Sequence, residues 1–111
     1  MLFRSKVDGS VRTQITRTVG YDGGAAYSRD GKQLVWRAGY PKDAAQLAKY
    51  RELLAANVTA PMKMELMVAG ADGRNARAIT NFGCASFAPT FTPDGKKILF
   101  EIGRASCRER V

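Results

Sequence analysis

The feature that most constrains this 111-residue chain is an internal repeat with an offset of 64 residues. The stretches YSRDGKQLVW (27–36) and FTPDGKKILF (91–100) share an Asp-Gly-Lys core between aromatic ends. At the same offset, VDGSVRTQIT (7–16) aligns with ADGRNARAIT (71–80). No gap is needed anywhere between residues 2 and 36. Two ordered matches at one offset indicate a structural unit that occurs more than once.

Each Asp-Gly pair predicts a tight β-hairpin. Residues 28–31 and 92–95 read as type I turns closed by a left-handed glycine, and Pro93 suits the second position of such a turn. The flanking segments alternate in polarity and are rich in strand-forming residues. The predicted strands are 2–6 and 12–16, 25–28 and 32–36, 65–68 and 76–80, and 87–92 and 96–101.

Residues 41–61 interrupt the repeat and predict a helix over about 42–57. Asp43 is suited to cap its start, and Asn57 is suited to end it in the left-handed conformation. Leu47, Tyr50 and Leu54 form one narrow apolar stripe, which we expect to pack on the strands. Without this insertion of about 20 residues the repeat shortens to roughly 44 residues, an ordinary length for a four-stranded propeller blade.

The predicted fold class is therefore all-β: a partial β-propeller built from four-stranded antiparallel blades, with one helical insertion. We expect residues 1–18 to form the last two strands of one blade and residues 19–81 a complete blade that carries the insertion 41–61. Residues 82–101 would form the first hairpin of the next blade. Because propeller blades bury their apolar faces against neighbours, the chain is expected to be a segment that needs the rest of a ring for stability.

The last ten residues, IGRASCRERV (102–111), break the alternating pattern and resemble the translation of a sequencing adapter. We expect a non-native tail there, and the alternative is a genuine basic terminus. Without it, residues 1–101 carry 15 Lys and Arg against 9 Asp and Glu, a net charge of +6. On this interpretation Cys84 and Cys107 are not expected to pair, and Cys84 is a small half-buried residue.

Composition argues against several classes of function. The basic residues are scattered, which favours a solvated surface over a nucleic-acid site, and no apolar run is long enough for membrane insertion. The chain has no histidine, so no Ser/His/Asp or Cys/His arrangement can form. The turn residues Asp8, Asp30, Asp72 and Asp94 lie on separate hairpins, where a structural role is sufficient. We therefore expect no catalytic, cofactor or metal site.

These repeats resemble the WD-like β-propeller repeats of the TolB type. The resemblance rests on Asp30-Gly31-Lys32 with 34–36, on TPDGKKILF (92–100), and on Asp72-Gly73 with 78–80. It covers residues 2 to about 101, and the chain departs from the pattern at Arg29, where proline is usual, and in its helical insertion. The resemblance implies a non-catalytic protein-binding scaffold in a secreted or periplasmic protein. The alternative is the propeller domain of a larger peptidase or hydrolase whose catalytic domain lies outside this chain.

The insertion is the one feature that points to a particular protein partner, because loops on rigid scaffolds often carry recognition. The candidate residues are Tyr40, Lys42, Tyr50 and Arg51, which include the aromatic and arginine types that are enriched at binding hot spots. The alternative is that the apolar stripe packs on the strands and leaves the basic residues merely solvated.

Overall fold

The computed structural model describes residues 1–59 and 62–103. This part of the chain is mostly β, with antiparallel sheets and one helix. The elements in chain order are β1 (Phe3–Arg4), β2 (Thr13–Gln14), β3 (Tyr21–Tyr27), β4 (Gln33–Gly39), α1 (Ala44–Ala55), β5 (Glu65–Gly70), β6 (Arg77–Ala78), β7 (Ala85–Phe91) and β8 (Ile98–Gly103).

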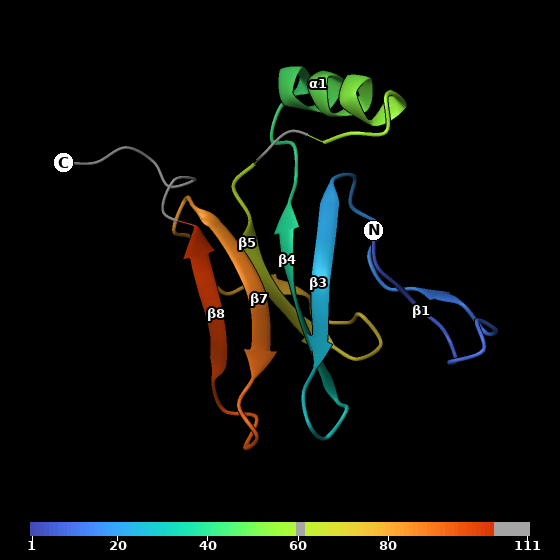
Figure 1. Cartoon of the computed structure of the whole chain (residues 1–111), viewed down its shortest axis with the longest axis vertical. Helices are drawn as coiled ribbons and strands as arrows, with labels where there is room; N and C mark the ends of the chain where they lie inside the picture. The colour runs from blue at the N-terminus through green and yellow to red at the C-terminus, as the bar shows by residue number, and fades with distance from the viewer. Residues whose placement is uncertain (60–61, 104–111) are drawn as a thin grey trace.

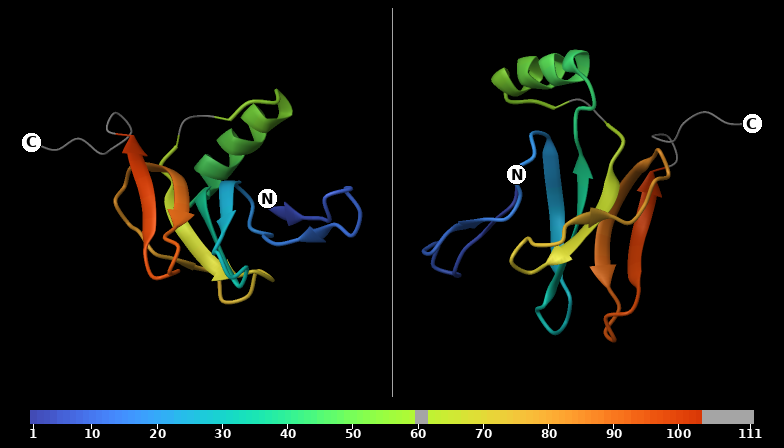
Figure 2. Two further views of the ribbon diagram at one scale, coloured as in Figure 1. Left: turned by 60° about the horizontal axis from the view of Figure 1, so that its bottom comes forward. Right: turned by 180° about the vertical axis from the view of Figure 1, so that it is seen from behind.

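The strands form three sheets that follow chain order: β1-β2, β3-β4-β5-β6 and β7-β8. Figure 1 shows β1 on one side of the central four-stranded sheet and the β7-β8 hairpin on the other, and the view from behind in Figure 2 agrees. Helix α1 joins β4 to β5 and lies beyond one end of the central sheet. The central sheet is therefore flanked on both faces.

Strand β4 is buried on both faces, which explains its nearly continuous apolar sequence. On one face Leu34, Trp36 and Ala38 form the main core cluster with Ala69 of β5 and with Ile15, which follows β2. Trp36 is only 1% exposed. Burial of such a side chain stabilises the fold by several kcal/mol, about 3–5 as judged by truncation to alanine.

The other face of β4 carries Val35, fully buried, and Arg37. The Arg37 guanidinium lies over the rings of Tyr21 (5.5 Å to the centroid) and Phe87 (5.3 Å), and it donates a hydrogen bond to the Tyr21 hydroxyl at 2.9 Å. Since Phe87 belongs to β7, this cation–π contact joins the central sheet to the next hairpin.

The predicted turns are confirmed in detail. Gly31 and Gly95 both have φ of 74°, the left-handed region that glycine enters without a steric penalty. Their N–H groups donate to Ser28 O at 2.9 Å and to Thr92 O at 2.8 Å. Glycines 9 and 73 also have positive φ, of 86° and 89°. All four Asp-Gly pairs therefore close turns of the same local type.

Eight strands form where strands are predicted, but with shifted bounds. β3 begins at Tyr21, four residues before the predicted 25, and β6 keeps only Arg77–Ala78 of the predicted 76–80. The strands of the first hairpin are also short. Only Phe3–Arg4 and Thr13–Gln14 are extended and paired within the predicted strands 2–6 and 12–16. This hairpin has no third strand among the described residues, and two strands alone form a marginal sheet.

Helix α1 is shorter than the predicted 42–57 but ends where its caps require. The Asp43 side chain accepts a hydrogen bond from Gln46 N at 2.8 Å, and Asn57 has φ of 61°. Leu47 and Tyr50 are half-buried. The prediction for Leu54 is wrong: it is 52% exposed, because α1 does not lie flat on the sheet and buries no side chain completely.

Two expectations concern the end of the chain. Ile102 and Gly103, placed with the expected tail, belong to β8, and residues 104–111 lie outside the described residues. Cys84 is buried, with 6% exposed, and it is disulfide-bonded, which contradicts the expectation that it does not pair. Cys107, with which Cys84 was expected not to pair, is not among the described residues.

Candidate binding groove

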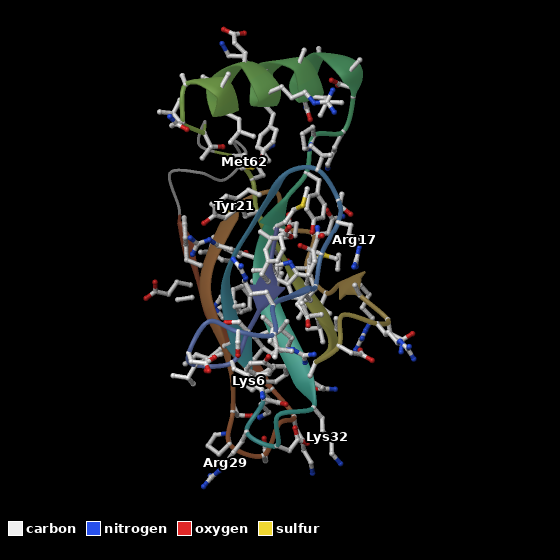
Figure 3. All side chains as sticks on the ribbon, turned by 90° about the vertical axis from the view of Figure 1, so that its right-hand side faces the viewer. Lys6, Arg17, Tyr21, Arg29, Lys32 and Met62 are labelled. Atoms are coloured by element: carbon white, nitrogen blue, oxygen red, sulfur yellow. The ribbon has the colours of Figure 1, made fainter. Side chains whose placement is uncertain are left out.

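A groove of about 1400 Å³ lies between α1 and the near end of the central sheet. Its walls come from the end of β4 with the residues that follow it, one side of α1, the connection from α1 to β5, the first half of β5, and the end of β6 with the turn after it. Figure 3 shows Met62, from that connection, between the helix and the strands. The helical insertion thus adds a hollow that a plain four-stranded sheet lacks.

Few contacts hold α1 in place, and this is why a groove remains. The Tyr50 hydroxyl donates to Gly20 O at 2.9 Å, which ties the middle of the helix to the loop before β3. Leu53 lines the groove, while Leu54 points to solvent. On the strand side, Gly39 is buried, and a Cβ there would meet Lys63 O at 2.9 Å. The close approach of the 62–63 backbone to β4 therefore requires glycine.

Tyr40 lines the groove with its ring, while its hydroxyl is already engaged. The hydroxyl donates a short hydrogen bond to the buried carboxylate of Asp22. Burial raises the pKa of Tyr40 well above its usual value, and the hydrogen bond and charge of Asp22 act in the same direction. Tyr40 is therefore a neutral, fixed aromatic surface at neutral pH.

Asp22 fixes Tyr40 through a network that reaches three segments. Its carboxylate also accepts from Trp36 Nε1 at 2.9 Å and from Thr16 Oγ1 at 2.9 Å. Asp22 is only 9% exposed, so these hydrogen bonds compensate for the loss of water around the carboxylate.

The turn after β6 is held by Glu65, at the start of β5. Its carboxylate accepts from Thr80 Oγ1 at 2.7 Å, from Phe82 N at 3.1 Å and from Gly83 N at 2.8 Å. Phe82 is 53% exposed on this wall, and its ring stacks on Phe100 with centroids 6.0 Å apart. Both carboxylate oxygens of Glu65 therefore accept hydrogen bonds from the turn after β6, which forms this wall of the groove.

The exposed rim of the groove is positively charged. Lys42, Lys49 and Lys63 are exposed lining residues, and Glu65 is the one acidic residue among the described lining residues. Lys49 also lies 3.8 Å from Glu52 on the same helix, an exposed pair that is worth little. The groove therefore combines a cationic rim with the rings of Tyr40, Tyr50 and Phe82.

Three of the four residues proposed from the sequence, Tyr40, Lys42 and Tyr50, line this groove, and Arg51 does not. Arg51 is exposed on the helix. Sequence reasoning missed Met62, Lys63 and Phe82. Nothing local marks these residues, because they approach the helix only when β5 and the turn after β6 have folded.

Within residues 1–59 and 62–103, no cluster of three or more His, Cys, Asp or Glu side chains could hold a metal ion. No helix in the same ranges is long and apolar enough to cross a membrane. The turn aspartates bind their own hairpins, as where Asp30 Oδ1 accepts from Lys32 N at 2.9 Å.

No protein family, curated protein or solved structure matches this chain.

Proposed function

We propose that this chain is a non-catalytic protein-binding scaffold built of β-propeller blade repeats, from a secreted or periplasmic TolB-like protein. The observation that carries the binding role is the groove beside α1, where aromatic rings converge under a lysine rim. The TolB-like assignment and the location rest on the resemblance of the repeats alone.

The arrangement of the sheets supports the blade interpretation. The β3-β6 sheet is a four-stranded antiparallel meander that contacts a hairpin on each face. Neighbouring propeller blades stack face to face in this way. The helix lies outside the four-stranded unit, so it adds to the unit without interrupting the pairing of β4 with β5.

The chemistry of the groove favours an acidic, extended segment of a partner protein. Carboxylates on such a segment would complement Lys42, Lys49 and Lys63, and its apolar side chains would pack on Tyr40, Tyr50 and Phe82. Tyrosine and other aromatic residues contribute strongly to binding when a partner covers them.

Fluorescence anisotropy with a labelled peptide of alternating glutamate and phenylalanine residues tests this proposal. The double variant Lys42→Glu, Lys49→Glu should bind at least about tenfold more weakly, which corresponds to about 1.4 kcal/mol. The control is Arg29→Glu, Lys32→Glu, which changes the net charge equally in the β3-β4 turn, at the end of the molecule away from α1 (Figure 3). Its affinity should equal that of the wild type.

Equal weakening in both variants would mean that only overall charge matters. A peptide that does not bind the wild-type chain at low salt would also contradict the proposal.

A further inference from the structure

The sheet edges that have no partner strand among the described residues include the outer edge of β8 over 98–102 and the outer edge of β1. Open edges present unpaired N–H and C=O groups and can accept another strand. At the 64-residue offset, β8 corresponds to β4 of the central sheet and β1 corresponds to β5. Those two strands are paired, from Gln33↔Gly70 to Ala38↔Glu65.

The β1-β2 hairpin has the same local structure as β5-β6. Leu2 N donates to Thr16 Oγ1 at 2.8 Å, and at the 64-residue offset Leu66 N donates to Thr80 Oγ1 at 2.9 Å. The backbone bonds from Ile15 N to Leu2 O (2.8 Å) and from Ile79 N to Leu66 O (2.9 Å) also correspond. β1 is therefore shaped like β5.

The β7-β8 hairpin reproduces β3-β4 in the same way. The register of the first shifts between Phe87 and Thr90, and that of the second shifts between Gly23 and Ala26, at the same offset. The turn bonds match as well: Gln33 N to Ser28 Oγ is 3.0 Å and Lys97 N to Thr92 Oγ1 is 3.1 Å. β8 is therefore shaped like β4.

We propose that β8 of one copy pairs antiparallel with β1 of a second copy of this chain, in the register that joins β4 to β5. Transfer of that register places Phe100 opposite Phe3, as Trp36 lies opposite Met67. It places Leu99 opposite Arg4, as Val35 lies opposite Val68. The four strands form one composite sheet between the central sheets of two copies.

The exposed apolar side chains of the two edges support this occupant. Leu99 is 70% exposed, whereas its counterpart Val35 is fully buried, and Phe3 is 63% exposed, whereas its counterpart Met67 is half-buried. Pairing would cover both, because the composite sheet has a central sheet on each face. The contact joins two different surfaces, so it propagates from copy to copy into a ring or an open chain.

Sedimentation of the full chain tests the proposal. The wild type should form concentration-dependent species larger than the 12.1 kDa monomer. Leu99→Lys and Phe3→Lys should each weaken association at least about tenfold, because each would bury an unpaired charge at one edge. Both side chains are exposed in the monomer, so circular dichroism and Tm should stay close to the wild type.

A mixture of the two variants gives the decisive readout. Each variant retains one intact edge, so the mixture should form a heterodimer of twice the chain mass and no larger species.

Leu54→Lys, at an equally apolar exposed position on α1, should associate like the wild type. A monomeric wild type, a mixture that stays monomeric, or equal loss in Leu54→Lys would overturn the proposal. Neither Phe3 nor Leu99 lines the groove, so self-association and peptide binding can fail separately.

Discussion

At the scale of single residues, the Asp-Gly pairs specify this structure most directly. Glycine supplies the positive φ, and the preceding aspartate accepts hydrogen bonds from its own turn. In two hairpins the bonds are nearly identical: Asp30 Oδ1 accepts from Ser28 Oγ at 2.7 Å, and Asp94 Oδ1 accepts from Thr92 Oγ1 at 2.6 Å. Such local bonds explain why turn positions could be read from the sequence.

These bonds predict a dependence of stability on pH. The hydroxyl bonds from Ser28 and Thr92, followed by the backbone bonds from Lys32 and Lys96, lower the pKa of Asp30 and Asp94 from the ordinary value of 3.8. A lowered folded-state pKa contributes stability that is present above the unfolded pKa and is lost as pH falls through the folded pKa.

We therefore expect Tm to fall below about pH 4 as these carboxylates protonate. The double variant Asp30→Asn, Asp94→Asn should show a shallower fall in Tm between about pH 2 and pH 5. Thermal unfolding followed by circular dichroism across that range provides the measurement. An unchanged slope would show that other carboxylates control acid unfolding.

At the scale of elements, α1 differs from the strands because it is held at its ends and at one tyrosine. Its N-terminus depends on Asp43, and its C-terminus is closed by bonds from Asn57 N to Leu54 O at 2.9 Å and from Val58 N to Leu53 O at 3.0 Å. Since α1 buries no side chain completely, its stability is largely independent of the core.

Asp43→Ala should therefore destabilise the helix by about 1 kcal/mol and change global unfolding little. Amide hydrogen exchange of 44–55 should speed up about fivefold, while exchange in β4 and β5 stays at the wild-type rate. Asp43→Asn, which keeps the capping oxygen, is the matched control, and amide exchange in its helix should stay as slow as in the wild type. An equal loss of protection in β4 would contradict this independence.

At the scale of the whole molecule, the Asp22 carboxylate joins the first hairpin to the central sheet and to the groove. It accepts hydrogen bonds from Thr16, which follows β2, from Trp36 in β4, and from Tyr40 after β4. No other described side chain receives donors from all three of these segments.

Asp22→Ala should lower the free energy of unfolding by about 3 kcal/mol, because buried donors would lose their acceptor. Urea unfolding measures this change. Asp43→Ala, which removes an exposed carboxylate, serves as the comparison and should cost much less. A loss below about 0.5 kcal/mol would show that water replaces the carboxylate at these donors.

The sequence by itself determined the turns, the approximate places of the eight strands and the two caps of α1. These features depend on φ preferences and on hydrogen bonds between residues a few positions apart. Only the tertiary structure decided that β4 is covered on both faces, that α1 leaves a groove, and that Lys63 and Phe82 join Tyr40 there. Such convergence depends on how distant segments pack, and no short stretch of sequence contains that information.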